Sequence, residues 1–122
     1  MMVTPLELAI MKAVWDRSPI TVRDVQMAIR PDRHLAYTTV MTIMDRLFHK
    51  GFLNRRLETR THFYEPAISY ADVRDDALNT LLENFFGGSP QKLRGFLDTN
   101  EDEPRVHTPP QSMRNSLDEE LL

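Results

Sequence analysis

The sequence has no cysteine among its 122 residues, which excludes disulfides, thiol catalysis and the usual zinc fingers. It also has no long apolar run and no N-terminal pattern of basic residues followed by apolar ones. We therefore expect no membrane insertion and a cytoplasmic location. Hydrophobic residues make up 41% and charged residues 27% of the chain, both close to the averages for soluble proteins. This length predicts one domain with an appendage.

A basic net charge is also missing, because the whole chain carries a formal charge of −3. The two parts of the chain differ in sign, however. Residues 1–66 contain ten Lys and Arg against seven Asp and Glu, whereas residues 67–122 contain five against eleven. The basic charge therefore belongs to the N-terminal part, and only there does the balance favour an anionic partner.

Patterns for catalysis or for a bound cofactor are absent as well. The four histidines, His34, His49, His62 and His107, are scattered without metal-ligand spacing. No Ser/His/Asp arrangement, Gly-rich phosphate loop or pair of carboxylates stands out, and the acidic runs resemble solvated charge. We expect a protein that is not an enzyme and holds no metal or cofactor.

Three helices are predicted in the first fifty residues. Thr4-Pro5-Leu6-Glu7 forms a capping box that starts the first, and Thr21-Val22-Arg23-Asp24 gives a similar start to the second. A third helix is expected from about Ala36 to Lys50, where Gly51 provides a left-handed cap.

A hairpin follows, with strands expected at 52–57 and 61–65. The connecting residues 58–60 lack an Asn-Gly or Asp-Gly signal, which leaves the register and the turn length open. Three helices and a hairpin in a net basic segment are the order of a winged helix-turn-helix. The expected fold class is mainly α (α+β), with a winged-helix domain at 1–66. A winged-helix module that binds protein instead of DNA is the alternative, because the fold serves both uses.

The third helix is predicted to be the recognition helix. Its apolar arc holds Ala36, Tyr37, Val40, Met41, Ile43, Met44, Leu47 and Phe48. Its polar arc holds Thr38, Thr39, Thr42, Asp45, Arg46, His49 and Lys50. Threonine is a mediocre helix former, but its short hydroxyl side chain lets a helix approach DNA closely, while Arg46 and Lys50 can reach phosphate or guanine.

Basic residues on the hairpin strengthen this interpretation. The candidates for backbone or minor-groove contacts on the wing are Arg55, Arg56, Arg60 and His62. Arg23 at the start of the second helix and Arg33 before the third are candidates for further phosphate contacts. Hairpin charges can also serve only to protect strand edges, but their coincidence with the threonine-rich helix favours DNA binding.

Residues 67–97 are predicted to form a helical dimerisation segment. Ser69 to Asp72 cap a fourth helix that ends at Gly87-Gly88, and Ser89-Pro90 start a fifth. The apolar residues on these helices are Leu78, Leu81, Leu82, Phe85, Phe86, Leu93, Phe96 and Leu97. They exceed what two isolated helices can bury, which predicts a homodimer.

The remaining residues, 98–122, are predicted to be an acidic, proline-containing and largely disordered tail. Met113, Leu117 and Leu121 share one face of a possible last short helix, although so few turns are marginal alone.

The run Leu35-Ala36-Tyr37-Thr38-Thr39-Val40-Met41-Thr42-Ile43-Met44-Asp45-Arg46-Leu47, followed by Lys50-Gly51, resembles the BlaI/MecI family of penicillinase and methicillin-resistance repressors. The similarity covers roughly residues 4–97. It implies a homodimeric repressor on a palindromic operator, with residues 67–97 as the dimer interface and an inducing protease or sensor as a further partner. It also implies that Tyr37, Thr38, Thr39, Thr42 and Arg46 face the DNA.

The sequence departs from the family pattern in two places, and a missing residue type bears on one branch of the family. Some staphylococcal members are cleaved at an Asn-Phe bond, but Gly95 stands before Phe96 here, so the resemblance does not carry that inducing mechanism over. Pro104, Pro109 and Pro110 interrupt the region where the family continues into a last helix. The lack of cysteine argues against the copper-responsive branch, whose metal site resembles paired Cys-x-Cys motifs.

Overall fold

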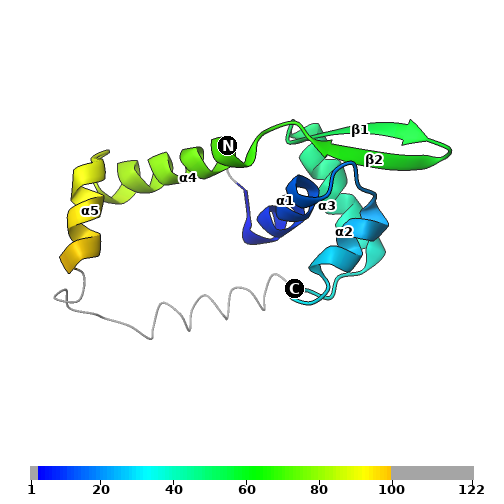
Figure 1. The fold of residues 1–122 in the computed structure, drawn as a ribbon, viewed down its shortest axis with the longest axis horizontal. Coiled ribbons are helices and arrows are strands. Elements are labelled where there is room, and N and C mark those ends of the chain that lie inside the picture. The colour runs from blue at the N-terminus through cyan, green and yellow to red at the C-terminus, as the bar shows by residue number, and fades with distance from the viewer. Residues whose placement is uncertain (1–2, 100–122) are drawn as a thin grey trace. The chain divides into compact units, whose positions relative to one another are not determined.

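The computed structural model describes residues 3–99 (Figure 1). The elements are α1 (Pro5–Asp16), α2 (Val22–Ile29), α3 (Tyr37–His49), β1 (Leu53–Glu58), β2 (Thr61–Pro66), α4 (Tyr70–Phe85) and α5 (Pro90–Thr99). Two compact units divide between Leu81 and Leu82, within α4. The expected disorder from residue 100 onward and the expected last helix lie outside the described residues.

The starts of α1 and α2 confirm the capping signals. The Thr4 hydroxyl accepts a hydrogen bond from the Glu7 amide at 3.1 Å, and the Glu7 carboxylate accepts one from the Thr4 amide at 3.0 Å. Pro5 occupies the first helical position. Thr21 caps α2 in the same way by accepting from the Asp24 amide at 3.1 Å. Both helices therefore begin where side chains satisfy amides that have no partner within the helix.

The core lies between α1, α2, α3 and the hairpin. Its fully buried members include Ile10, Met11, Val14, Val25, Val40, Met44, Leu47 and Leu53. The predicted apolar arc of α3 is confirmed at its centre but wrong at its edge, because Tyr37 and Met41 are each 42% exposed. α3 ends as predicted, since Gly51 adopts a φ of +88° that side chains with a Cβ rarely tolerate.

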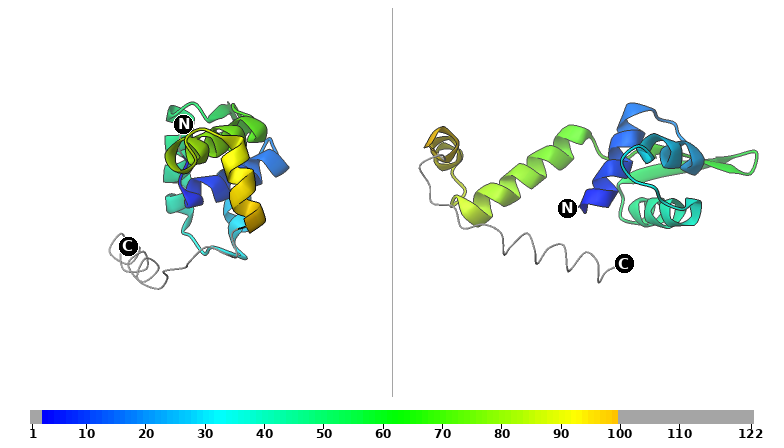
Figure 2. Two further views of the ribbon diagram at one scale, coloured as in Figure 1. Left: turned by 90° about the vertical axis from the view of Figure 1, so that its left-hand side faces the viewer. Right: turned by 90° about the horizontal axis from the view of Figure 1, so that it is seen from below.

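The hairpin has the register that the sequence left open. Glu58 pairs with Thr61, so the turn contains only Thr59 and Arg60, with φ values of 49° and 68°. Positive φ at both turn residues is the geometry that matches the twist of the strands, although it usually recruits Asn and Gly. The hairpin projects beyond the three helices in Figure 1 and in the view from below in Figure 2.

A single residue extends the sheet in a way that the sequence did not indicate. The Ile20 amide donates to the Tyr64 carbonyl at 3.0 Å, and the Tyr64 amide donates to the Ile20 carbonyl at 2.8 Å. Both side chains are buried. The loop before α2 is thus joined to β2, which ties the base of the wing to the helices.

The first turns of α4 belong to the N-terminal unit. The Trp15 indole donates to the Ile68 carbonyl at 2.9 Å, and its ring meets Tyr70 edge-on at 5.3 Å between centroids. Val73 is 4% exposed and belongs to the main core. The Ser69 hydroxyl caps α4 as predicted, accepting from the amide of Asp72.

The C-terminal unit begins with the last residues of α4. The amide of Gly88, in a left-handed conformation, donates to the Leu82 carbonyl at 2.8 Å and closes the helix end. Ser89 caps α5 by accepting from the Lys92 amide at 3.2 Å. The rings of Phe86 and Phe96 lie 5.7 Å apart. α5 continues to Thr99, two residues beyond the expected end at 97.

Candidate nucleic-acid interface

The polar side of α3 carries an open depression. It has a volume of about 370 Å³ and is lined by Thr38, Thr39, Thr42, Ile43 and Arg46. The three threonines and Arg46 are exposed. Within residues 3–99 the hydroxyls of Thr38, Thr39 and Thr42 find no hydrogen-bond partner, so they are available to an external one. The structure thus brings four predicted site residues together on one helical face.

The start of α3 leaves its first backbone amides without a side-chain partner. Ala36 is the N-cap residue, and it offers no capping hydrogen bond. Amides at such a helix start carry partial positive charge and suit a phosphate oxygen. The loop before α3 is held in place by Gln26 of α2, whose amide donates to the Leu35 carbonyl at 2.9 Å. Sequence reasoning missed this bond, because a glutamine on a helix surface gives no distinguishing signal.

A second depression lies between α2, α3 and β2. Its volume is about 320 Å³, and it is lined by Thr21, Val22, Arg23, Tyr37, Met41, Arg60, Thr61, His62 and Tyr64. The Arg23 guanidinium lies 5.6 Å from the centre of the Tyr37 ring, an attractive arrangement that orients the cation. Arg60 and His62 reach the same depression from the hairpin. Candidate residues from three elements therefore share one concave, basic surface.

Arg55 is held within the protein. Its Nη1 donates to Asp45 Oδ1 at 2.9 Å and to the Tyr64 hydroxyl at 3.4 Å. Its guanidinium lies 4.1 Å from the centre of the Phe48 ring. The hydrogen bonds to Tyr64 and Asp45 raise the pKa of Arg55 further above its usual value, so the cation stays charged. The sequence predicted a DNA contact here and gave no sign of these partners.

Arg56 also has internal partners. It points to the opposite face of the hairpin from its neighbour Arg55, because successive strand residues alternate. There it forms ion pairs with Glu58 and with Glu65, the latter at 3.2 Å. These carboxylates, Glu58 first, raise the pKa of Arg56. Its charge is largely compensated before any DNA approaches.

Lys50 lies in an ion pair with Glu7. Its Nζ is 3.1 Å from one carboxylate oxygen and 3.2 Å from the other, and the Glu7 side chain is only 4% exposed. Burial raises the pKa of Glu7, but the hydrogen bond from Thr4 and the charge of Lys50 together outweigh burial and lower it. The structure therefore gives Lys50 an internal partner where the sequence predicted a phosphate contact.

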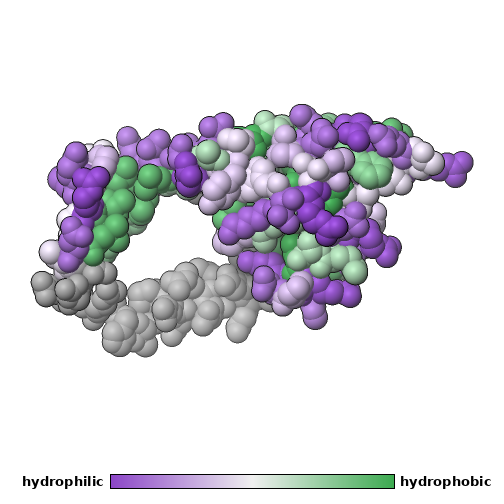
Figure 3. Space-filling model, viewed as in Figure 1, coloured by the Kyte–Doolittle hydropathy of each residue, from purple (hydrophilic) through white to green (hydrophobic). Residues whose placement is uncertain are grey.

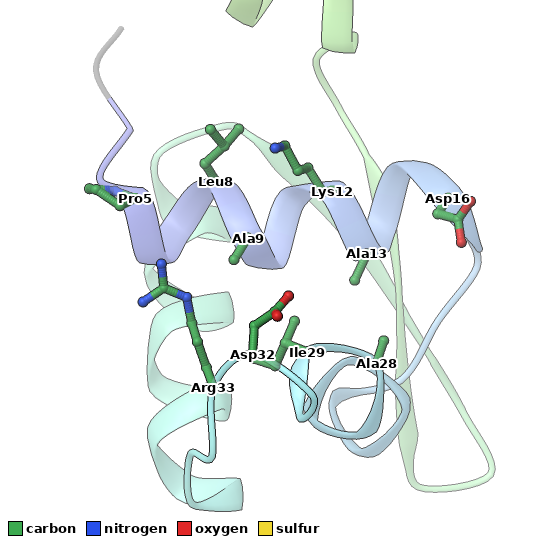
Figure 4. A pocket seen from close by; sticks show the side chains of 10 residues that line it. All are labelled: Pro5, Leu8, Ala9, Lys12, Ala13, Asp16, Ala28, Ile29, Asp32 and Arg33. Carbon is green, nitrogen blue, oxygen red and sulfur yellow. The ribbon is translucent and has the colours of Figure 1, made fainter.

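Arg33 lines a third depression, between α1 and the segment from α2 to α3 (Figure 4). This groove has a volume of about 580 Å³ and is lined by Pro5, Leu8, Ala9, Lys12, Ala13, Asp16, Ala28, Ile29, Asp32 and Arg33. In Figure 4 the Arg33 side chain extends toward Pro5 at the start of α1. The structure does not bring Arg33 to the depressions that hold the threonines and the wing residues.

The apolar residues predicted to form a dimer interface differ in exposure. Leu78, Leu81, Phe85, Phe96 and Leu97 are exposed, and Phe85 reaches 75%. Phe86 and Leu93 are half-buried, and Leu82 is buried. Figure 3 shows apolar side chains gathered beside α5 and the C-terminal end of α4. Exposed apolar residues in such number are unusual for a surface that meets only water.

The described residues hold no group of three or more His, Asp or Glu side chains that could bind a metal ion. In the same part of the chain, no helix is both long and apolar enough to cross a membrane.

Comparison with known proteins places the sequence among bacterial regulators. The profile of the family described as "Penicillinase repressor" matches residues 3–106. "Transcriptional regulator BlaI" of Mycobacterium tuberculosis is 45% identical over 62 residues, which cover 50% of this chain and 45% of that protein. "Penicillinase repressor" of Bacillus licheniformis is 29% identical over 100 residues, 81% of this chain and 78% of that one. The chain thus spans less than half the length of the mycobacterial relative.

Two solved structures have similar folds. One is the solution structure of the DNA-binding domain of the repressor BlaI, with a TM-score of 0.53, 31% identity, and coverage of 58% of this chain and 87% of that one. The other is the Bacillus licheniformis BlaI monomeric form in complex with the blaP half-operator, with a TM-score of 0.51 and 30% identity. It covers 59% of this chain and 88% of that one. The predicted winged helix-turn-helix is therefore confirmed.

Proposed function

The chain belongs to the penicillinase repressor family, and on that premise we propose that it is a transcriptional repressor that binds operator DNA. The observation that carries this proposal is the exposed face of α3, where three threonines without internal partners lie beside Arg46. In a major groove, hydroxyls and methyl groups at this spacing can contact base edges. The complex of the related BlaI with its half-operator supports the proposal.

We assign different tasks to the two depressions. The exposed face of α3 contacts base edges through Thr38, Thr39, Thr42 and Arg46. The basic depression contacts the DNA backbone through Arg23, Tyr37, Arg60 and His62. Phosphate contacts fix the position of a protein on DNA, whereas contacts to base edges carry the sequence information. Mutations on the α3 face should therefore lower sequence discrimination, whereas mutations in the basic depression should lower affinity for any DNA.

We further propose that the repressor acts as a homodimer on a palindromic operator. The support is the exposed apolar surface of α4 and α5, above all Phe85 and Leu97. Two copies joined by this surface would present two recognition helices to two half-sites. In this proposal residues 1–66 form the DNA-binding domain and residues 67–97 the dimerisation segment. Release of the operator on induction, through a sensor or a protease, completes the scheme.

Fluorescence anisotropy on two duplexes tests the DNA-binding proposal. One duplex is selected by the full chain from a random library, and the other is a shuffled sequence of the same composition. Thr42→Ala should weaken binding to the selected duplex about fivefold and leave its salt dependence nearly unchanged. Arg60→Ala should weaken binding to both duplexes and lower the salt slope by about one counterion per subunit.

Lys12→Ala provides the matched control, because Lys12 is an exposed cation outside both depressions. It should change neither affinity by more than about twofold. A wild-type protein that does not distinguish the two duplexes, and whose binding does not respond to salt, would contradict the proposal. Such a result would favour a winged-helix module that binds protein.

A further inference from the structure

The contact between Arg55 and α3 joins the two parts of the candidate interface. Arg55 belongs to β1, whereas its partners Asp45 and Phe48 belong to α3. The bond to Asp45 is a charged hydrogen bond of 2.9 Å, and such bonds are roughly twice as strong as neutral ones. This contact therefore links the wing directly to the recognition helix.

The register of the hairpin explains why Arg55 meets the helix. Arg55 pairs directly with Tyr64, so both side chains point to the same face of the hairpin. Tyr64 is 2% exposed, and both its backbone amide and its backbone carbonyl are hydrogen-bonded to Ile20. The Tyr64 hydroxyl is thus a fixed acceptor for Arg55. Arg56, one residue later, points to the other face and cannot take part.

Three neighbours fix the plane of the guanidinium. The Asp45 carboxylate and the Tyr64 hydroxyl accept from Nη1, and the Phe48 ring packs against the cation. The Arg55 side chain is only 24% exposed. Arginine suits such a site because its planar group can donate hydrogen bonds in its plane and stack on a ring with its face. Lysine, with a compact charge, would reproduce only part of this contact.

We propose that Arg55 and Asp45 are positioning residues that hold the wing at a fixed angle to the recognition helix. This inference rests on the proposed DNA-binding function. When α3 lies in the major groove, the fixed angle places Arg60 and His62 against the backbone with a smaller loss of entropy than a mobile wing would have. Asp45 thereby aids DNA binding, although it puts a negative charge on the DNA-facing helix.

The two possible roles of Arg55 predict opposite changes in DNA affinity when Asp45 is replaced. If Arg55 were a phosphate ligand, Asp45→Asn would free the cation, remove a repulsive charge and tighten binding to any DNA. If the pair positions the wing, the same change loosens the hairpin and weakens binding to the selected duplex. Asparagine has nearly the size of aspartate, so the packing of α3 is preserved.

The experiment measures the affinities of the full chain for the selected and the shuffled duplex at several salt concentrations. Asp45→Asn should weaken binding to the selected duplex by about threefold or more, and Arg55→Met by about tenfold. Arg60→Ala should weaken binding about fivefold in the wild type but less than about twofold in the Arg55→Met background. A wing without a fixed position gains little from its tip residue.

The controls separate this inference from general effects. Asp16→Asn removes an exposed carboxylate at the end of α1 and should tighten binding slightly, as expected for loss of negative charge alone. Thermal unfolding of each variant shows whether the fold persists. Arg55→Lys keeps the charge, and on a logarithmic scale it should recover less than half of the affinity that Arg55→Met loses.

Tighter binding by Asp45→Asn, or independent effects of Arg55→Met and Arg60→Ala, would overturn the positioning role. Full recovery by Arg55→Lys would do the same. If instead the wild type fails to distinguish the two duplexes, the proposed function itself is wrong. The two failures are therefore distinguishable.

Discussion

Replacing Lys50 by methionine should destabilise the N-terminal unit by about 3 kcal/mol, because it leaves the buried Glu7 carboxylate without its cation. The Glu7 side chain is 4% exposed, so water replaces the lost partner only in part, whereas Lys50 itself is 38% exposed. Glu7 retains the hydrogen bond from the Thr4 amide, which keeps the loss near the lower end for buried pairs. Glu7→Gln, which leaves the more exposed cation free to reach water, should destabilise by about 2 kcal/mol.

Thermal and urea unfolding measure these differences. For a unit of this size, 3 kcal/mol corresponds to a melting temperature lower by about 18 °C. Lys12→Met is the matched control, since Lys12 lies on the exposed side of α1, and it should change stability by less than about 0.5 kcal/mol. Equal stabilities of Lys50→Met and Lys12→Met at neutral pH would refute the reasoning.

The pH dependence provides a second test of the same pair. The pKa of Glu7 is lowered in the folded protein, so its ionised form stabilises the fold above the ordinary glutamate pKa of about 4.3. This contribution is lost as the pH falls through the lower folded pKa. Without Lys50, burial is opposed by one cation fewer, and the pKa of Glu7 rises. The destabilisation caused by Lys50→Met should therefore shrink on acidification.

Three further predictions concern other parts of the chain. Thr59→Asn should stabilise the protein by about 1 kcal/mol in urea unfolding, because asparagine tolerates the positive φ of this turn residue better than threonine. The affinity for DNA should not change, because Arg60 keeps its place in the turn. Trp15→Phe should destabilise the N-terminal unit by at least about 1 kcal/mol, since the Ile68 carbonyl loses its hydrogen-bond donor. Unfolding monitored by circular dichroism measures this loss. Phe85→Lys should give a monomer in light scattering; a wild type that is already monomeric at micromolar concentration would contradict the proposed dimer.

Signals within a few residues of one another were predictable from the sequence. The capping box of Thr4 and Glu7 and the glycine cap at Gly51 depend on side chains that act on their own helix end, and both are confirmed. The bridge between Ile20 and Tyr64 was not predictable, because one extended residue has no alternating pattern and its partner lies far along the chain. The two-residue turn was also open, since Thr59 is unfavourable there.

The ion-pair partners of long side chains were the main feature that could not be predicted from the sequence. The sequence predicted DNA contacts for Lys50, Arg55 and Arg56 alike. Their chains are long enough to reach several neighbours, and only the folded structure shows which carboxylates they meet. Composition therefore identified the basic part of the chain without separating the cations that hold the fold from those that remain available.

That separation changes how the charge of residues 1–66 bears on DNA binding. The three paired cations are matched by four carboxylates, Glu7, Asp45, Glu58 and Glu65. Outside these pairs, seven Lys and Arg face only three Asp. Because a paired cation brings its own counter-charge, it releases few counterions when DNA binds. The salt slope should therefore follow the unpaired residues, Arg23, Arg46 and Arg60 foremost, and a slope that falls equally on loss of Arg56 and of Arg60 would show that internal pairing does not decide which cations meet the DNA.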